Sequence, residues 1–160
     1  MSNLFLRPEV ITFFVSMLPI SELRGALPFA LSQGLSPMKA YFISVAGNIL
    51  PVLPLLLFLE KILKLLQFHK GEKIINWLRG RAGKREDLVK RYGFGGLIIL
   101  VSIPLPITGA WTGSLVSFLL RMRVKYAFSA ICIGVCLAGI IVLLVSLGVM
   151  GGVRFFLYGM

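Results

Sequence analysis

The sequence is poor in charged residues, and especially in acidic ones, which limits the kind of protein it can encode. Of its 160 residues only 14% are charged, while 58% are hydrophobic. Soluble globular chains carry about 25% charged and about 45–50% apolar residues. An ordinary soluble domain is therefore excluded. We expect an all-α integral membrane protein in which residues 1–160 form a single membrane domain.

Residues that build metal, redox or catalytic centres are also scarce. The chain contains two cysteines and one histidine. Cys132 and Cys136 lie in a long apolar run, where free cysteines usually act as small hydrophobes, and His69 lies in a charged segment typical of a solvated side chain. The glycines of Gly93–Gly96 lack the Lys and Ser/Thr of a phosphate-binding loop. We therefore expect no metal, no cofactor and no enzymatic activity.

Basic residues, by contrast, are plentiful and gather in one segment. The chain has 17 Lys and Arg against 6 Asp and Glu, and ten of the cations lie between Glu60 and Arg91 with four of the acids. A soluble basic face would suggest nucleic acid as a partner. Between apolar segments, the same charge indicates a cytoplasmic loop, because Lys and Arg are retained inside. We predict that residues 60–93 are cytoplasmic, that membrane lipids are partners and that nucleic acid is not.

Two apolar runs are long enough to cross a bilayer, which takes roughly 20 residues. They are Met38–Leu59 and Tyr126–Gly148. The first contains Asn48 and Pro51, so we predict a kinked helix in which Asn48 faces protein, most simply in a hydrogen bond between helices.

Two further apolar regions are interrupted near their middle. Their arms of about ten to twelve residues would reach roughly 15–18 Å as helices, about half of the 30 Å hydrocarbon core. Such lengths favour re-entrant helical hairpins, although one continuous kinked span is the alternative. No removable signal peptide is expected in the first region, because charged residues follow its apolar arm without a cleavage pattern. The arms and tips are Val10–Leu18, Pro19–Gly25 and Ala26–Leu31, then Phe94–Ile103, Pro104–Gly109 and Ala110–Leu120.

The distribution of charge favours hairpins over continuous spans. If the second region returns to the side it entered from, Arg121, Arg123 and Lys125 join the basic segment, giving thirteen cations on that side against three on the other. A continuous span would place these three residues on the opposite side. The larger asymmetry is the one that positive-inside topology predicts.

The two interrupted regions resemble each other, which suggests an internal repeat. Leu18–Ser21 (LPIS) recurs as Leu105–Thr108 (LPIT), an offset of 87 positions. Each half, residues 1–66 and 94–160, would hold one hairpin and one crossing, joined by the basic connection 67–93. A single crossing turns the second half upside down, so we predict an inverted repeat with hairpin tips near the midplane, where secondary transporters place their binding sites.

Glu22 and Arg24 are the strongest candidate site residues, because an ionisable side chain inside a membrane costs roughly 2.5–3.5 kcal/mol and is a functional candidate. Arg24 suits carboxylate or phosphate oxygens. Our hypothesis is that Arg24 and two helix starts bind an anionic group, and that Glu22 couples its release to protonation. The alternative is a structural ion pair between Glu22 and Arg24 that holds the tip.

The second tip supplies the remaining candidates for binding the solute or ion. Pro104, Pro106, Thr108 and Gly109 form the tip itself. Trp111 follows it as a possible cavity wall, for which ordinary packing is an equally good explanation.

The segments Ser21–Pro28 (SELRGALP) and Pro104–Gly113 (PLPITGAWTG) resemble the "putative small multi-drug export protein" family over nearly the whole chain. That family is similar to the DedA, or VTT-domain, membrane proteins, which have paired re-entrant hairpins. The resemblance implies roles for Glu22, Arg24 and the tip at 104–109. Gly25 and Pro28, in the first of the two motifs, are further candidates for binding the solute or ion. This chain is shorter than DedA proteins and has Thr108-Gly109-Ala110 where they carry an acidic residue.

Together these features predict a transporter of the inner (plasma) membrane. It would be proton-coupled and would move a small amphipathic or anionic solute, as a small multi-drug exporter or an anionic-lipid flippase. A chain this small encloses little cavity, so we expect a homo-oligomer. The alternative function is a non-transporting membrane assembly or lipid-organising protein.

Overall fold

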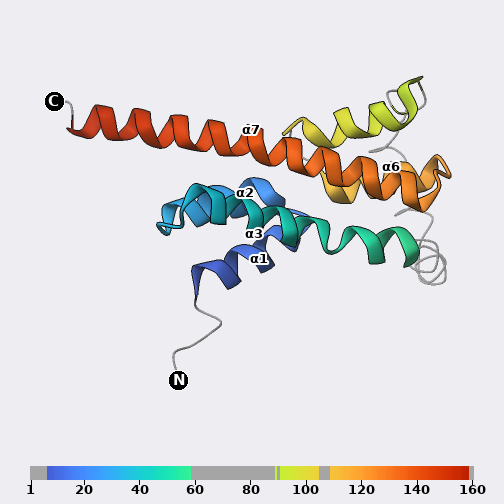
Figure 1. Ribbon diagram of the computed structural model, residues 1–160, viewed down its shortest axis with the longest axis horizontal. Helices are drawn as coiled ribbons and strands as arrows, with labels where there is room; N and C mark the ends of the chain where they lie inside the picture. Colours follow the sequence, from blue (N-terminus) through green and yellow to red (C-terminus); the bar gives the residue numbers. More distant parts are fainter. Residues whose placement is uncertain (1–6, 59–88, 90, 105–108, 159–160) are drawn as a thin grey trace. The chain divides into compact units, whose positions relative to one another are not determined.

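The computed structural model describes residues 7–58, 89, 91–104 and 109–158, with side chains described up to residue 152. Within this part all regular structure is helical, which confirms the all-α class there, whereas most of the predicted cytoplasmic connection lies outside it. The helical segment that begins at Pro37 is interrupted at Leu50-Pro51 and continues over residues 52–58, in agreement with the predicted kink. The helices are α1 (Pro8–Met17), α2 (Glu22–Ser32), α3 (Pro37–Ile49), Arg91–Ser102, α6 (Ala110–Leu119) and α7 (Val124–Tyr158) (Figure 1).

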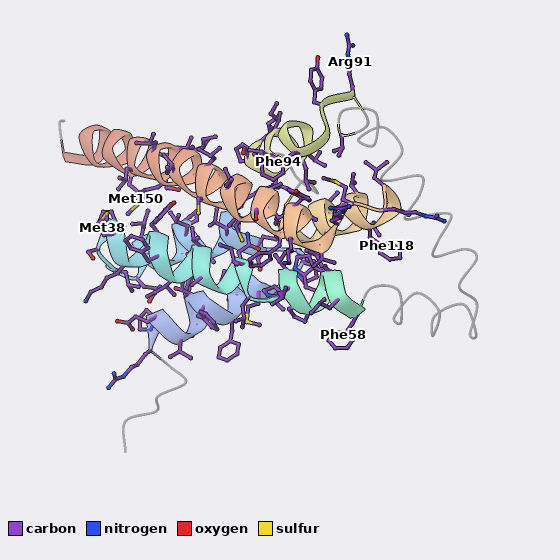
Figure 2. All side chains as sticks on the ribbon, turned by 45° about the vertical axis from the view of Figure 1, so that its right-hand side comes forward. Met38, Phe58, Arg91, Phe94, Phe118 and Met150 are labelled. Atoms are coloured by element: carbon purple, nitrogen blue, oxygen red, sulfur yellow. The ribbon has the colours of Figure 1, made fainter. Side chains whose placement is uncertain are left out.

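Two of the helical segments have the length and composition of membrane spans. Pro37–Phe58 has 22 residues and Val124–Gly152 has 29. Only 33% of the first and 39% of the second is buried, whereas the core helix of a soluble protein is mostly buried. Figure 2 shows the exposed side chains of Met38 and Phe58, near the two ends of the first segment. These helices therefore match the two spans expected from the sequence.

One face of α7 carries a continuous row of exposed apolar side chains. They recur at alternating steps of four and three residues, the spacing that places side chains on one face of a helix. Exposing an apolar row of this length to water would be unfavourable. The same row is favourable where the helix faces lipid. The row consists of Ile133, Leu137, Ile140, Leu144 and Leu147.

The chain forms two compact units. The first comprises residues 1–48 and 136–160, and the second comprises residues 49–135. In the first unit α1 packs against α2 and, at Gly47, against α3, as Figure 1 also shows. The Tyr41 hydroxyl donates a 3.1 Å hydrogen bond to the carbonyl oxygen of Cys136, which joins α3 to α7. Glycines allow this close packing, as in many membrane proteins.

In the second unit α6 folds back against the helix Arg91–Ser102. A Cβ atom added to Gly113 would lie 2.6 Å from Cγ2 of Val101. In one continuous helix these two positions, twelve residues apart, would be separated by about 18 Å. Residues 91–119 therefore do not form a continuous span in the described structure. The start of α7 packs on the same helix, since a Cβ at Gly134 would lie 3.1 Å from the carbonyl oxygen of Ile98.

Both interrupted regions are thus pairs of short helices, although the breaks differ from those expected. The first break covers only residues 18–21, and α2 begins at Glu22 rather than after Gly25. Its backbone closes a turn early because the N–H of Gly25 already donates to the carbonyl of Ser21, at 2.8 Å. With 10 and 11 residues, α1 and α2 are each about 15–17 Å long. The predicted half-membrane length of the arms is confirmed, and their position in a bilayer stays a prediction.

The second helix of each pair ends in the same way. Gly34 and Arg121, 87 positions apart, both have positive φ, of 81° and 52°. In each case the next N–H bonds back to the third-last residue of the helix, from Leu35 to Ala30 and from Met122 to Ser117. This is the Schellman ending of a helix. The inverted orientation of the two halves stays a prediction.

Candidate functional site

Local hydrogen bonds join the break between α1 and α2 to the ends of the two helices. The Ser21 hydroxyl donates to the carbonyl of Val15 at 2.7 Å, and the N–H of Glu22 donates to the carbonyl of Leu18 at 2.9 Å. The apolar side chain of Ile20, within this break, is 97% exposed.

Glu22 turns inward at this break. Its side chain is only 7% exposed, and its φ of 45° lies in the left-handed region that residues other than glycine rarely adopt. A left-handed conformation costs an L-residue roughly 1–2 kcal/mol. Glu22 is also the first residue of α2, where the helix dipole presents its positive end to a carboxylate. Burial and an unfavourable backbone angle therefore coincide at the one acidic residue of this hairpin tip.

Arg24, Gly25 and Pro28 follow on the same helix. Arg24 is half-buried. A Cβ at Gly25 would lie 3.0 Å from Cβ of Ser21, so a small residue there lets the tip close. Pro28 lies inside α2 and has no N–H to give to the carbonyl of Arg24. The four predicted residues of the first tip thus share the first two turns of α2.

At the second break the structure describes Pro104, Gly109 and Trp111, whereas Pro106 and Thr108 lie outside the described residues. Gly109 is buried, and its extended backbone forms the N-cap of α6, where its carbonyl accepts a 2.8 Å hydrogen bond from the N–H of Gly113. Trp111 is half-buried in the first turn of α6. These residues surround a helix start, as those of the first tip do. A meeting of the two tips at one pocket stays a prediction, because they belong to different units.

The structure also reveals buried polar residues that the sequence analysis did not assign to a site. Thr12 and Ser16 on α1, and Ser44 on α3, are fully buried, and Asn48 is 3% exposed. The sequence signal was the four-residue spacing of polar residues within apolar runs, which puts each pair on one helix face. Asn48 faces protein as predicted. Its Oδ1 atom has no hydrogen-bond partner in the described part of the chain, and the expected bond between helices stays a prediction.

Long apolar helices that are mostly exposed, together with an ionisable residue buried at a helix break, define a membrane protein. A model of the family described as "Putative small multi-drug export protein" matches residues 22–141. The chain belongs to this family, and the resemblance expected from its two motifs is confirmed. The match begins at Glu22, the first residue of α2, and includes the second helix break. No curated protein and no solved structure matches the chain. The similarity to DedA proteins stays a prediction.

Proposed function

We propose that the protein moves a small amphipathic solute with an anionic group across the inner membrane, and that Glu22 and Arg24 form the binding site. Membership of a family described as exporters supports the class of function. The observation that supports the site is Glu22, a buried carboxyl group with a left-handed backbone at the start of α2. Unusual backbone angles of this kind cluster at functional sites.

Arg24 and the start of α2 provide the attraction for an anion. The guanidinium stays charged in any state and presents several N–H donors to carboxylate or phosphate oxygens. The positive end of the helix dipole adds to this attraction within the first turn. A cation inside a membrane is costly, so an anionic solute would lower the free energy of the site.

Glu22 couples binding to protons because its carboxylate and the solute compete for the same positive charge. When Glu22 is protonated, Arg24 and the helix start are available to the solute. When Glu22 loses its proton, the carboxylate competes and the solute is released. Proton and solute binding therefore favour each other, a linkage that is reciprocal by thermodynamic necessity.

In this proposal the two hairpins place the binding site inside the membrane. Each pair of short helices would enter the membrane partway, the first from the outer face and the second from the cytoplasmic face. The inverted arrangement would bring the helix starts at Glu22 and Ala110 toward the midplane, as in other transporters built from inverted repeats. A homo-oligomer would enclose the exposed tip residues Leu18 and Ile20.

Transport by the purified protein in liposomes tests this proposal. The probes are fluorescent phosphatidylglycerol, which carries an anionic headgroup, and fluorescent phosphatidylcholine, which carries no net charge. We expect movement of the anionic probe between leaflets to increase at acidic pH. Arg24→Ala should reduce the rate at least tenfold, and Glu22→Gln should remove its dependence on pH. The exposed residues Glu9 and Arg7 provide matched controls, since Glu9→Gln and Arg7→Ala should leave transport unchanged.

Normal, pH-dependent transport by correctly inserted Glu22→Gln and Arg24→Ala proteins would exclude the proposed site. If the folded wild-type protein moves neither lipid, nor a fluorescent cationic dye, the result would favour a non-transporting assembly or lipid-organising role. A structural ion pair predicts another pattern, in which both variants lose thermal stability and transport survives in the molecules that remain folded.

A further inference from the structure

Ser44 and Asn48 lie one turn apart on the buried face of α3, and each has an oxygen atom without a partner. Ser44 is 0% exposed and Asn48 is 3% exposed. Within the described residues, neither Oγ of Ser44 nor Oδ1 of Asn48 has a hydrogen-bond partner. Residues four apart on a helix are neighbours on its surface, so both atoms belong to one patch.

The other buried serine and threonine hydroxyl groups among the described residues each have a hydrogen-bond partner. The hydroxyls of Thr12 and Ser16 donate to backbone carbonyls of α1 at 2.6 and 2.7 Å. Those of Ser114 and Ser117 do the same in α6, at 2.7 and 2.8 Å. Bonding to the preceding turn is thus the usual solution for a serine in these apolar helices. Ser44 does not adopt it, although an unsatisfied buried polar group costs roughly 1–3 kcal/mol.

The chemistry of the patch favours a positively charged ligand. The amide oxygen of Asn48 is only an acceptor, so it needs a cation or a hydrogen-bond donor. Asn48 lies in the last turn of α3, where the helix dipole is negative, and Ser44 lies one turn before it. Pro51 has no N–H to give to the carbonyl of Gly47, so this carbonyl lacks the donor that a continuous helix would supply. Carbonyls at interrupted helices are common ligands of coupling ions in transporters.

We propose that Ser44 and Asn48 bind a monovalent metal cation at the C-terminal end of α3. Hydroxyl and amide oxygens are hard ligands, which suit alkali and alkaline-earth cations better than transition metals. Divalent cations of this group usually require carboxylates, whereas these two side chains are neutral. A bound cation would be a partner for both unsatisfied oxygens. It would also offset the partial negative charge at the end of the helix. The site is separate from the anion site proposed at α2 and does not depend on the transported solute.

Thermal unfolding of the purified full-length protein in detergent tests the cation site, with Na⁺ as the probe. Choline chloride replaces NaCl at constant ionic strength, and KCl serves as a second arm. A ligand that binds only the folded state raises the melting temperature as its concentration exceeds the Kd. We expect the wild-type melting temperature to rise with Na⁺, Asn48→Leu to abolish the rise, and Ser44→Ala to raise the half-saturating concentration at least tenfold.

Ser114 provides the matched control, because it is equally buried but its hydroxyl has a partner. Ser114→Ala should keep the full Na⁺ dependence. In choline chloride the two alanine variants should differ in their effect on the melting temperature. Ser114→Ala loses a hydrogen bond and should melt at a lower temperature, whereas Ser44→Ala removes an unsatisfied hydroxyl and should melt at the same or a higher temperature.

A second variant keeps the proposal testable if Asn48→Leu does not fold. Asn48→Asp retains the oxygen ligand and adds negative charge, so it should lower the half-saturating Na⁺ concentration. Direct binding of radioactive ²²Na⁺ to wild-type and Asn48→Asp protein gives the same comparison without unfolding. Equal melting temperatures of the wild type in Na⁺, K⁺ and choline would overturn the proposal and leave water as the occupant. A Na⁺ dependence that survives unchanged in both Ser44→Ala and Asn48→Leu would also overturn it.

Discussion

Gly47 lies where α1 packs directly on α3 within the first unit. A Cβ atom there would collide with the hydroxyl oxygen of Ser16 and would lie 2.5 Å from the carbonyl oxygen of Phe13. The second contact involves backbone, which cannot rotate away as the end of a side chain can. A glycine at this position therefore fixes how closely the two helices approach.

Gly47→Ala should destabilise the protein by about 1–3 kcal/mol, the usual cost of overpacking a well-packed site. The physical reason is that α1 must move away from α3 to admit the methyl group. Thermal or denaturant unfolding in detergent measures the change. Gly148→Ala is the control, since a Cβ at Gly148 meets nothing within 4 Å. Alanine there should be neutral or stabilising because it favours the helix. Equal effects of the two substitutions would contradict the close packing of α1 on α3.

Single residues also show how far the sequence could predict the site. The presence of Glu22 and Arg24 in an apolar region was visible, because charge is rare there. The left-handed angle of Glu22 was not, since it depends on how the break hydrogen-bonds to itself through Ser21. The unsatisfied oxygen of Asn48 was likewise hidden, because spacing predicts which face a residue occupies and not whether its partner is present.

At the scale of helices, the matching ends of α2 and α6 are an informative feature. Both end with a residue in the left-handed region followed by a hydrogen bond back to the third-last residue. In α2 this residue is Gly34, which adopts the angle freely. In α6 it is Arg121, which adopts it at a cost, because its Cβ approaches the following carbonyl. The two helices thus end with residues that differ in how readily they adopt the left-handed backbone angle.

Substitutions at these two positions should therefore have opposite effects on the free energy of unfolding. Gly34→Ala should destabilise the protein by about 1 kcal/mol, although a Cβ at Gly34 meets nothing within 4 Å, because the cost is conformational. Arg121→Gly should stabilise it by up to about 1 kcal/mol. Arg123→Gly removes the same charge two residues later and should not stabilise. Melting temperatures of the three variants provide the comparison, and a stabilising Gly34→Ala would contradict the assigned helix end.

The short helices were predictable because proline and glycine interrupt otherwise apolar runs. Their pairing was also predictable, and the position of Gly113 beside Val101 confirms it for the second pair. The exact start of α2 was predicted wrongly. Proline at 19 and glycine at 25 mark the outer limits of the break, whereas the bonds within it leave only residues 18–21 outside the helices. Breaker residues therefore located the tip and overestimated its length.

At the scale of the whole molecule, the length of α7 exceeds what a membrane requires. Its 35 residues extend about 52 Å, against a hydrocarbon core of about 30 Å. The helix must tilt or extend beyond the core. The predicted apolar run Tyr126–Gly148 lies within the candidate span Val124–Gly152, and the glycines at 151 and 152 do not end the helix. Hydropathy predicted the span and did not predict how far the helix continues beyond it.

The account depends most on the side of the membrane to which the second hairpin returns. Single cysteines introduced by Lys73→Cys, Arg123→Cys and Lys39→Cys, after replacement of Cys132 and Cys136 by alanine, can be labelled with a membrane-impermeant maleimide. Intact spheroplasts expose the outer face and inverted membrane vesicles expose the cytoplasmic face. We predict that positions 73 and 123 are labelled only in inverted vesicles and position 39 only in spheroplasts. Labelling of position 123 from the opposite face to position 73 would contradict the re-entrant hairpin.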